Sequence, residues 1–157
     1  MRKVLFVCLG NICRSPMAEA MFRHQLKEAH LENKIVVDSA GTAGWHEGKP
    51  PHMGTRNKLD ELNISYEGMT ARQLEQEDFS AFDVIIAMDE DNLSTLQTEF
   101  RMQEGNAKVC KLMDFVDNPK EENVPDPYFT GDFQYTYELI AEACTSLQTY
   151  LQEKYHI

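Results

Sequence analysis

The hydrophobic residues of the chain fall into short apolar runs that alternate with longer segments of helical periodicity. The first run, residues 4–7 (Val-Leu-Phe-Val), is typical of a strand that is buried on both faces. A helix is predicted from Ser15 to about His30, and a second strand over residues 34–39. Because a strand, a helix and a strand in this order form a right-handed crossover, we expect a parallel sheet.

The same alternation continues along the chain. It predicts a short helix, a third strand, a helix start rich in acidic residues, a fourth strand and a long final helix, over residues 55–62, 82–88, 89–92, 108–112 and 133–151. No linker or internal repeat divides the chain. We therefore predict a single domain over residues 1–157, of α/β class, with three layers: a four-stranded parallel sheet and helices on both faces.

Two irregular segments separate these elements. Residues 39–51 are rich in glycine and proline and follow the second strand, at the edge where α/β sheets bind ligands. Trp45 lies in this loop between glycines, which favours an exposed rim position over a place in the core. Residues 113–132 form the longest irregular segment, and long loops in compact domains are usually functional or disordered. Asp126 precedes a proline there, and by itself would be taken for part of a solvated turn.

Composition and charge exclude several classes of protein. The net charge of -11 argues against nucleic acid or an anionic membrane as a partner. No stretch approaches the length of a membrane span, and the apolar run after Met1 is too short for the core of a signal peptide. Four cysteines are too few for a disulfide scaffold in a chain of this size. We expect a cytoplasmic monomer.

The connection after the first strand carries the candidate chemistry. A short loop between a strand and a helix directs several backbone N–H groups and the positive end of the helix dipole into one small space. Cys8 stands at one end of this loop and Arg14 at the other, and both amides and a guanidinium favour a thiolate. Gly10 and Asn11 tolerate positive φ, and Ser15 is placed to cap the helix. A lone cysteine here would be a buried structural residue, but the combination predicts a nucleophile beneath a bound oxyanion.

The segment 7–16 (Val-Cys-Leu-Gly-Asn-Ile-Cys-Arg-Ser-Pro) resembles the low-molecular-weight protein tyrosine phosphatases, as a bacterial-type member, and the resemblance extends along nearly the whole chain. It implies metal-independent hydrolysis of phosphotyrosine monoesters through a phosphocysteine intermediate, with no cofactor. The substrates implied are phosphotyrosine-containing proteins or small aryl phosphates. The implied catalytic residues are Cys8 as nucleophile, Arg14 as phosphate clamp and Asp126 as general acid and base. The implied phosphate-binding loop contains Leu9, Gly10, Asn11, Ile12, Cys13 and Ser15.

The resemblance also implies roles outside this loop. The walls of the substrate cleft are expected from three aromatic residues, Trp45, Tyr128 and Phe129. Ser39 is expected to brace Asn11, which holds the shape of the loop through hydrogen bonds. Ser15 is expected to donate a hydrogen bond to the sulfur of Cys8, which makes the sulfur a better leaving group. The family often carries a histidine where this chain has Met69, so the usual hydrogen bond from that histidine to Asn11 is lost or replaced. No metal is expected, because the five histidines show no ligand spacing.

Four alternatives stay open at this point. Arsenate reductases share the fold but carry further redox cysteines after the third strand, where residues 89–105 have none. Phosphoarginine phosphatases carry threonine at the position of Ile12. Because isoleucine is bulkier and cannot hydrogen-bond, Ile12 favours phosphotyrosine as the substrate of this chain. A phosphopeptide-binding module would need neither the nucleophile nor the acid. Cys13 either fills space in the loop or traps oxidised Cys8 as a disulfide, a pairing that the resemblance favours.

Overall fold

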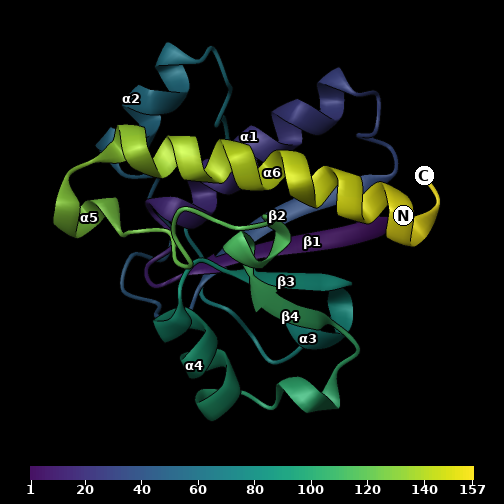
Figure 1. The fold of residues 1–157 in the computed structure, drawn as a ribbon. Coiled ribbons are helices and arrows are strands. Elements are labelled where there is room, and N and C mark those ends of the chain that lie inside the picture. The colour runs from purple at the N-terminus through teal and green to yellow at the C-terminus, as the bar shows by residue number, and fades with distance from the viewer.

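The computed structural model describes residues 1–157 and contains one four-stranded sheet (Figure 1). Its strands are β1 (Arg2–Cys8), β2 (Ile35–Gly41), β3 (Val84–Ala87) and β4 (Lys108–Lys111). They lie in the order β2-β1-β3-β4, and every neighbouring pair is parallel. This confirms the predicted α/β class and the all-parallel sheet.

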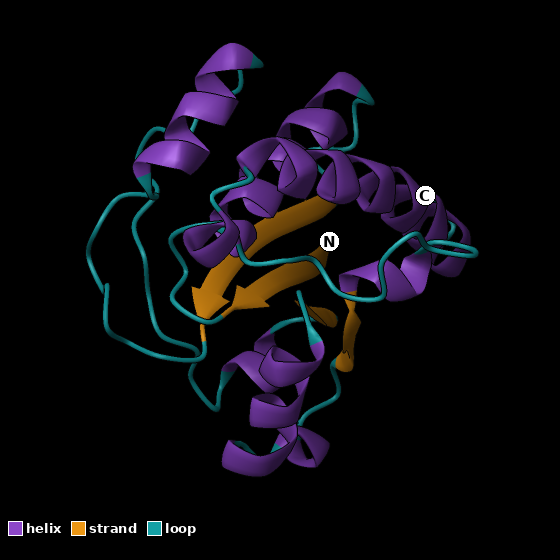
Figure 2. Cartoon of the chain, turned by 60° about the vertical axis from the view of Figure 1, so that its left-hand side comes forward, coloured by secondary structure: helices purple, strands orange, loops and turns teal.

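Helices cover both faces of the sheet, which confirms the three predicted layers (Figures 1 and 2). The α-helices are α1 (Arg14–Glu28), α2 (Met53–Glu61), α3 (Asp78–Ala81), α4 (Glu90–Glu99), α5 (Pro127–Thr130) and α6 (Phe133–Tyr155), and the 3-10 turns are η1 (Met102–Glu104) and η2 (Leu112–Phe115). In Figure 1, α1, α2 and α6 lie above the sheet, and α3 and α4 lie below it. None of the helices has the length and apolar character that crossing a bilayer requires.

The apolar run in β1 is explained by its central place in the sheet. Val4, Phe6 and Cys8 belong to the larger hydrophobic cluster, which contains residues of α1 and α6. Leu5 and Val7 point the other way, into a smaller cluster with residues of α3 and α4. Since successive side chains of a strand face opposite sides, a central strand with a core on each face must be apolar at every position.

The elements that the sequence did not predict are short. The helix α3 and the turn η1 have no more than four residues each, too few for a helical repeat to be visible in the sequence. The segment 113–132, expected to be irregular, contains α5 and most of η2. The first helix begins at Arg14 and carries no side-chain hydrogen bond at its N-cap, Cys13, so the predicted capping role of Ser15 is wrong.

The strand order fixes where a ligand can bind. The chain passes from β1 to β2 on one side and later returns to β3 on the other, so the connections after β1 and β3 diverge. In open α/β sheets a crevice forms at such a point, outside the carboxyl ends of the strands. Residues 9–13 follow β1, Trp45 lies in the loop after β2, and Asp89 follows β3. These segments therefore meet at one edge of the sheet.

Gly41, the last residue of β2, is packed against the loop that follows β1. A Cβ there would lie 2.8 Å from the carbonyl oxygen of Leu9 and 2.9 Å from that of Ala43. Because backbone atoms cannot move aside cheaply, we expect Gly41→Ala to lower the free energy of unfolding by about 1–3 kcal/mol in urea denaturation. Gly44→Ala is the matched control, since its Cβ would meet only the side chain of Gln73. Equal stability of the two variants would contradict this close packing.

Candidate active site

Residues 9–13 form a loop with free backbone donors. The N–H groups of residues 10–13 donate to no backbone carbonyl, although the loop leads directly into α1. Asn11 has a φ of 56° and so adopts the left-handed conformation that lets the loop turn tightly. Four consecutive free donors at the positive end of a 15-residue helix create a site for an anion.

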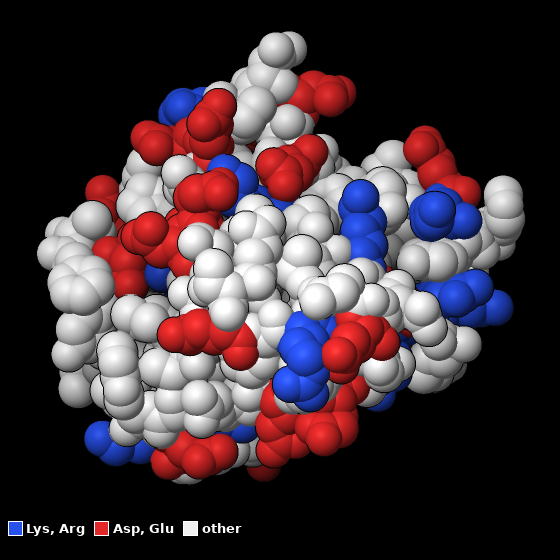
Figure 3. All heavy atoms as spheres, turned by 90° about the horizontal axis from the view of Figure 1, so that it is seen from below, with Lys and Arg blue, Asp and Glu red and all other residues white.

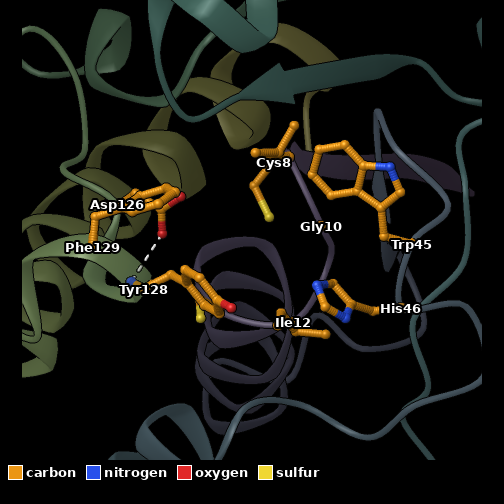
Figure 4. Close-up of a pocket in the computed structure, with 10 residues that line it drawn as sticks. Cys8, Gly10, Ile12, Trp45, His46, Asp126, Tyr128 and Phe129 are labelled. Carbon is orange, nitrogen blue, oxygen red and sulfur yellow. Dashed lines mark hydrogen bonds between the residues drawn. The ribbon is translucent and has the colours of Figure 1, made fainter.

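A cavity of about 120 Å³ opens above this loop. Its lining comes from the loop, from the segment after β2 and from the α5 region: Cys8, Leu9, Gly10, Ile12, Cys13, Trp45, His46, Asp126, Tyr128 and Phe129. In Figure 4 the sulfur of Cys8 points into the space between Trp45 on one side and Asp126 on the other. Trp45, Tyr128 and Phe129 are 71%, 55% and 75% exposed, so they form an aromatic rim.

Arg14 lies behind the cavity with 2% of its surface exposed. Its Nη1 donates to Asp89 Oδ2 at 2.5 Å and to the carbonyl oxygen of Val124 at 2.9 Å, and its Nη2 donates to Asp126 Oδ2 at 3.3 Å. Burial disfavours the charged guanidinium, but the neighbouring Cys8, Asp89 and Asp126 outweigh burial and raise the pKa of Arg14. Its Nε is buried and has no hydrogen-bond partner, which leaves a donor for a bound anion.

Asp126 is held at the mouth of the cavity through both carboxyl oxygens. It is the N-cap of α5, where Oδ1 accepts a hydrogen bond from the backbone N–H of Tyr128 at 3.1 Å (Figure 4). Pro127 occupies the first helical position, which suits its fixed φ. The second oxygen, Oδ2, pairs with Arg14. The local Asp-Pro-Tyr sequence thus places a carboxyl group beside the candidate nucleophile.

The hydroxyl of Ser15 lies under the sulfur instead of capping the helix. Ser15 Oγ is 3.0 Å from Cys8 Sγ, and it accepts a hydrogen bond from Asn11 Nδ2 at 2.8 Å. Because the hydroxyl accepts from Asn11, its own proton is left for one of two acceptors, the sulfur of Cys8 or the carbonyl oxygen of Ala40 at 3.5 Å, and the shorter contact favours the sulfur. Donation of this kind stabilises a thiolate.

The side chain of Asn11 connects the loop to the body of the protein. Asn11 Nδ2 also donates to Ser39 Oγ at 2.9 Å, as the bracing role predicted for Ser39 requires. Its Oδ1 accepts from the backbone N–H of Arg72 at 2.9 Å. Met69 has no group that could donate to Asn11, so the bond expected from the family's histidine is absent, and the backbone of Arg72 is the donor to Asn11 Oδ1.

Ser39 leads on to a buried carboxyl group that the sequence did not single out. Ser39 Oγ donates to Glu19 Oε1 at 2.6 Å, and Glu19 Oε2 accepts from Arg23, which also donates to the carbonyl oxygen of Val37. Since a carboxylate can only accept, it directs the Ser39 proton away from Asn11 and leaves the Ser39 oxygen free to accept from Asn11. The chain of hydrogen bonds thus runs from Arg23 at the surface to Cys8.

Burial raises the pKa of Glu19, and the hydrogen bonds from Ser39 and Arg23 oppose this only in part. The native state therefore holds the proton more tightly than the unfolded chain, and this contribution to stability is lost as the pH rises above 4.5. We expect wild type to lose stability relative to Glu19→Gln over that rise in urea titrations. Glu32→Gln, at an exposed position just after α1, should parallel wild type, and a curve for Glu19→Gln that also parallels wild type would contradict the prediction.

Cys13 shares the loop with Cys8, and both are free thiols. Burial, together with the nearby Cys8 and Asp126, raises the pKa of Cys13 to about 12. Cys13 is therefore a neutral thiol at physiological pH, unlike a nucleophile that must ionise. Its pairing with oxidised Cys8 stays a prediction that rests on the resemblance.

Sequence reasoning missed two residues that hold Arg14 and the loop. Asp89 was assigned only to a helix start, and it does cap α4, but its second oxygen binds Arg14. Glu19 is one turn beyond Ser15 on the same helix, so the two share a face. A signal for both was available: Asp89 is the second residue after β3, at the edge that carries Cys8, and Glu19 has the i, i+4 spacing from Ser15.

Comparison with known proteins identifies the family. A family model described as low molecular weight phosphotyrosine protein phosphatase matches residues 3–156. The low molecular weight protein-tyrosine-phosphatase YfkJ of Bacillus subtilis is 46% identical over 154 residues, covering 98% of each chain. The corresponding protein PtpA of Staphylococcus aureus is 42% identical over 148 residues, covering 94% of this chain and 92% of its own.

Solved structures agree with this assignment. The crystal structure of YfkJ matches with a TM-score of 0.94, covering 98% of this chain and 96% of the other. A Drosophila arginine phosphatase, DARP, matches with a TM-score of 0.87 at 35% identity, covering 96% and 98%. The family expected from the segment 7–16 is confirmed. The chain belongs to the low molecular weight phosphotyrosine protein phosphatase family, and it is a protein-tyrosine phosphatase.

Proposed function

We propose that the chain hydrolyses phosphotyrosine in proteins, or small aryl phosphates, in two steps that both pass through Cys8. In the first step the thiolate of Cys8 attacks phosphorus, and the S–P bond forms as the bond from phosphorus to the phenolic oxygen breaks. Asp126 donates its proton to that oxygen, so the leaving group departs as a phenol. The product of this step is phosphocysteine. The support is that Cys8 and Asp126 line one cavity.

The second step releases phosphate. The carboxylate of Asp126 takes a proton from water, whose oxygen bonds to phosphorus while the S–P bond breaks. The electron pair returns to sulfur, and the hydrogen bond from Ser15, 3.0 Å away, stabilises the restored thiolate. Cys8 is then again a thiolate and Asp126 again carries a proton, as before the first step. Apart from the substrate, the proposed steps use the side chains and backbone of the protein and water.

The four free N–H groups of residues 10–13 and Arg14 bind the phosphoryl oxygens in this proposal. Nε of Arg14 has no partner, whereas Nη2 has a long bond of 3.3 Å to Asp126. A phosphate that is gripped by Nε and Nη2 together displaces Asp126 from the guanidinium. The carboxyl group is then free to turn toward the leaving oxygen, to which it gives its proton in the first step.

The aromatic rim favours an aryl substrate. Trp45, Tyr128 and Phe129 stand above the sulfur, so they can line the two faces of a phenyl ring. A phosphoserine has no ring and is too short to reach Cys8 through such a slot. Ile12, which lies in the cavity wall, offers no hydrogen bond to a guanidinium. Both features favour phosphotyrosine.

Phosphoarginine is the second candidate substrate, because the fold is shared with the arginine phosphatase DARP. Turnover of phosphotyrosine and phosphoarginine peptides, measured side by side with a chelator present, decides between them. We expect a higher kcat/KM for phosphotyrosine, lost in Cys8→Ser. A preference for phosphoarginine would keep the proposed chemistry and overturn the substrate. Turnover of neither would contradict both candidates.

We propose that residues 1–157 form one catalytic domain that acts as a cytoplasmic monomer without nucleic acid, membrane or cofactor. Acidic side chains form several groups on the face shown in Figure 3, interspersed with Lys and Arg, and the net charge of the chain is -11. Such a surface repels polyanions, and at physiological salt the screening length of about 8 Å limits this repulsion to close range. A phosphorylated side chain can therefore still reach the loop.

A further inference from the structure

His52 lies at the junction of three segments around the cavity. Its backbone N–H donates to the carbonyl oxygen of Ile12 at 2.7 Å, and its Nδ1 accepts from the backbone N–H of Gly54 at 3.0 Å. It is thereby the N-cap of α2. Its ring stacks on Phe133, with centroids 5.4 Å apart and planes at 17°, and meets the ring of Tyr128 at 5.9 Å and 76°.

These contacts hold the imidazole in one place. The bond from Gly54 fixes the orientation of the ring and requires an unprotonated Nδ1. On its other side the imidazole meets Phe133, whose ring packs directly against Gly54 of α2: a Cβ on Gly54 would lie only 2.3 Å from that ring. Phe133 therefore cannot move toward α2. The ring of His52 is therefore a fixed surface between α2 and the first turn of α6.

Tyr128 depends on this surface. Its backbone N–H is held by Asp126, but its side chain is 55% exposed. The two rings that contact it are those of His52 and Phe129, and Phe129 is itself 75% exposed. An exposed ring cannot fix its neighbour, so the half-buried His52 is the support that orients Tyr128.

We propose that His52 is a positioning residue that sets the width of the aryl slot. Its backbone holds Ile12, which lines the cavity, and its ring holds Tyr128 at the rim. It does not line the cavity and does not contact the phosphate-binding donors. This inference rests on the proposed function, in which Tyr128 forms a wall for the phenyl ring.

Three substitutions separate the ring of His52 from its capping nitrogen. His52→Asn keeps a capping acceptor and removes the ring, His52→Phe keeps a ring and removes the acceptor, and His52→Ala removes both. The readouts are Tm, kcat and KM for p-nitrophenyl phosphate, and the inhibition constant of inorganic phosphate. Asn57→Ala, at an exposed position of α2, is the control.

We expect the ring to set KM and the capping nitrogen to set Tm. His52→Asn and His52→Ala should raise KM by about two- to tenfold, the range expected for losing one aromatic pair. His52→Phe should leave KM near the wild-type value, and both His52→Phe and His52→Ala should lower Tm. Loss of folded protein alone would lower the apparent kcat and leave KM unchanged. The inhibition constant of phosphate should stay constant, because phosphate binds below the rim.

Two results would overturn the inference. One is a KM that rises equally in His52→Phe and His52→Ala, which would assign the effect to the capping nitrogen. The other is an unchanged KM in the Asn variant. A wild type that fails to hydrolyse p-nitrophenyl phosphate would instead contradict the proposed function. Wild-type turnover thus tests the proposed function, and the KM values of the variants test the role of His52.

Discussion

Replacing Cys8 by serine is expected to lower kcat by at least about 10⁴-fold, the scale on which removal of a covalent nucleophile acts. A serine hydroxyl at this position is not ionised near neutral pH, and no base contacts it, since Ser15 is the one side chain that hydrogen-bonds Cys8 Sγ. Turnover of p-nitrophenyl phosphate measures the loss.

The anion site itself should survive this change, because its donors belong to the backbone of residues 10–13 and to Arg14. Inorganic phosphate should therefore still raise the Tm of Cys8→Ser. The control is Cys110→Ser, in β4, which should retain wild-type kcat. A Cys8→Ser variant with more than a hundredth of the wild-type kcat would contradict a role for Cys8 as nucleophile.

Replacing Asp126 by asparagine is expected to lower kcat by about 10²–10³-fold for phenyl phosphate, within the range for general acid catalysis. An amide cannot donate a proton to a phenolate. The loss should be smaller for p-nitrophenyl phosphate, whose leaving group needs less help. Asparagine can still accept the N-cap hydrogen bond from Tyr128, so α5 should persist.

The dependence on the leaving group distinguishes acid catalysis from a structural defect, which would affect both substrates alike. Asp117→Asn is the matched control, an exposed carboxyl in the same long segment. It should leave both rates unchanged. Equal losses for the two substrates in Asp126→Asn would contradict the assignment of Asp126 as the general acid.

Sequence reasoning succeeded where the physical cause is local. The buried strand β1, the tight turn at Asn11 and the helix start after it depend on neighbours within a few residues. Strand-helix-strand order then dictates a parallel sheet, and with it the edge where the loop lies. The exposure of Trp45 followed from its flanking glycines.

The features that sequence reasoning missed depend on distant partners. Asp89 is 75 residues from Arg14, and its pairing becomes visible only when β1 and β3 are known to be neighbours. Glutamate is common on exposed helix faces, so Glu19 stands out only once the structure shows that it is buried. Only the capping role assigned to Ser15 was wrong, because its hydroxyl bonds Asn11 and not the helix end, whereas the contact with the Cys8 sulfur that the resemblance implies is present at 3.0 Å.

The measurement that most directly tests the central claim is the location of phosphate during turnover. Asp126→Asn should slow the hydrolysis of phosphocysteine, so the variant is mixed with p-nitrophenyl phosphate, denatured within one turnover and digested for peptide mapping. We predict a phosphoryl group on the peptide that contains Cys8, absent in the same experiment with Cys8→Ser. Phosphate on another residue, or turnover with no phosphorylated peptide at any time, would contradict a reaction through Cys8.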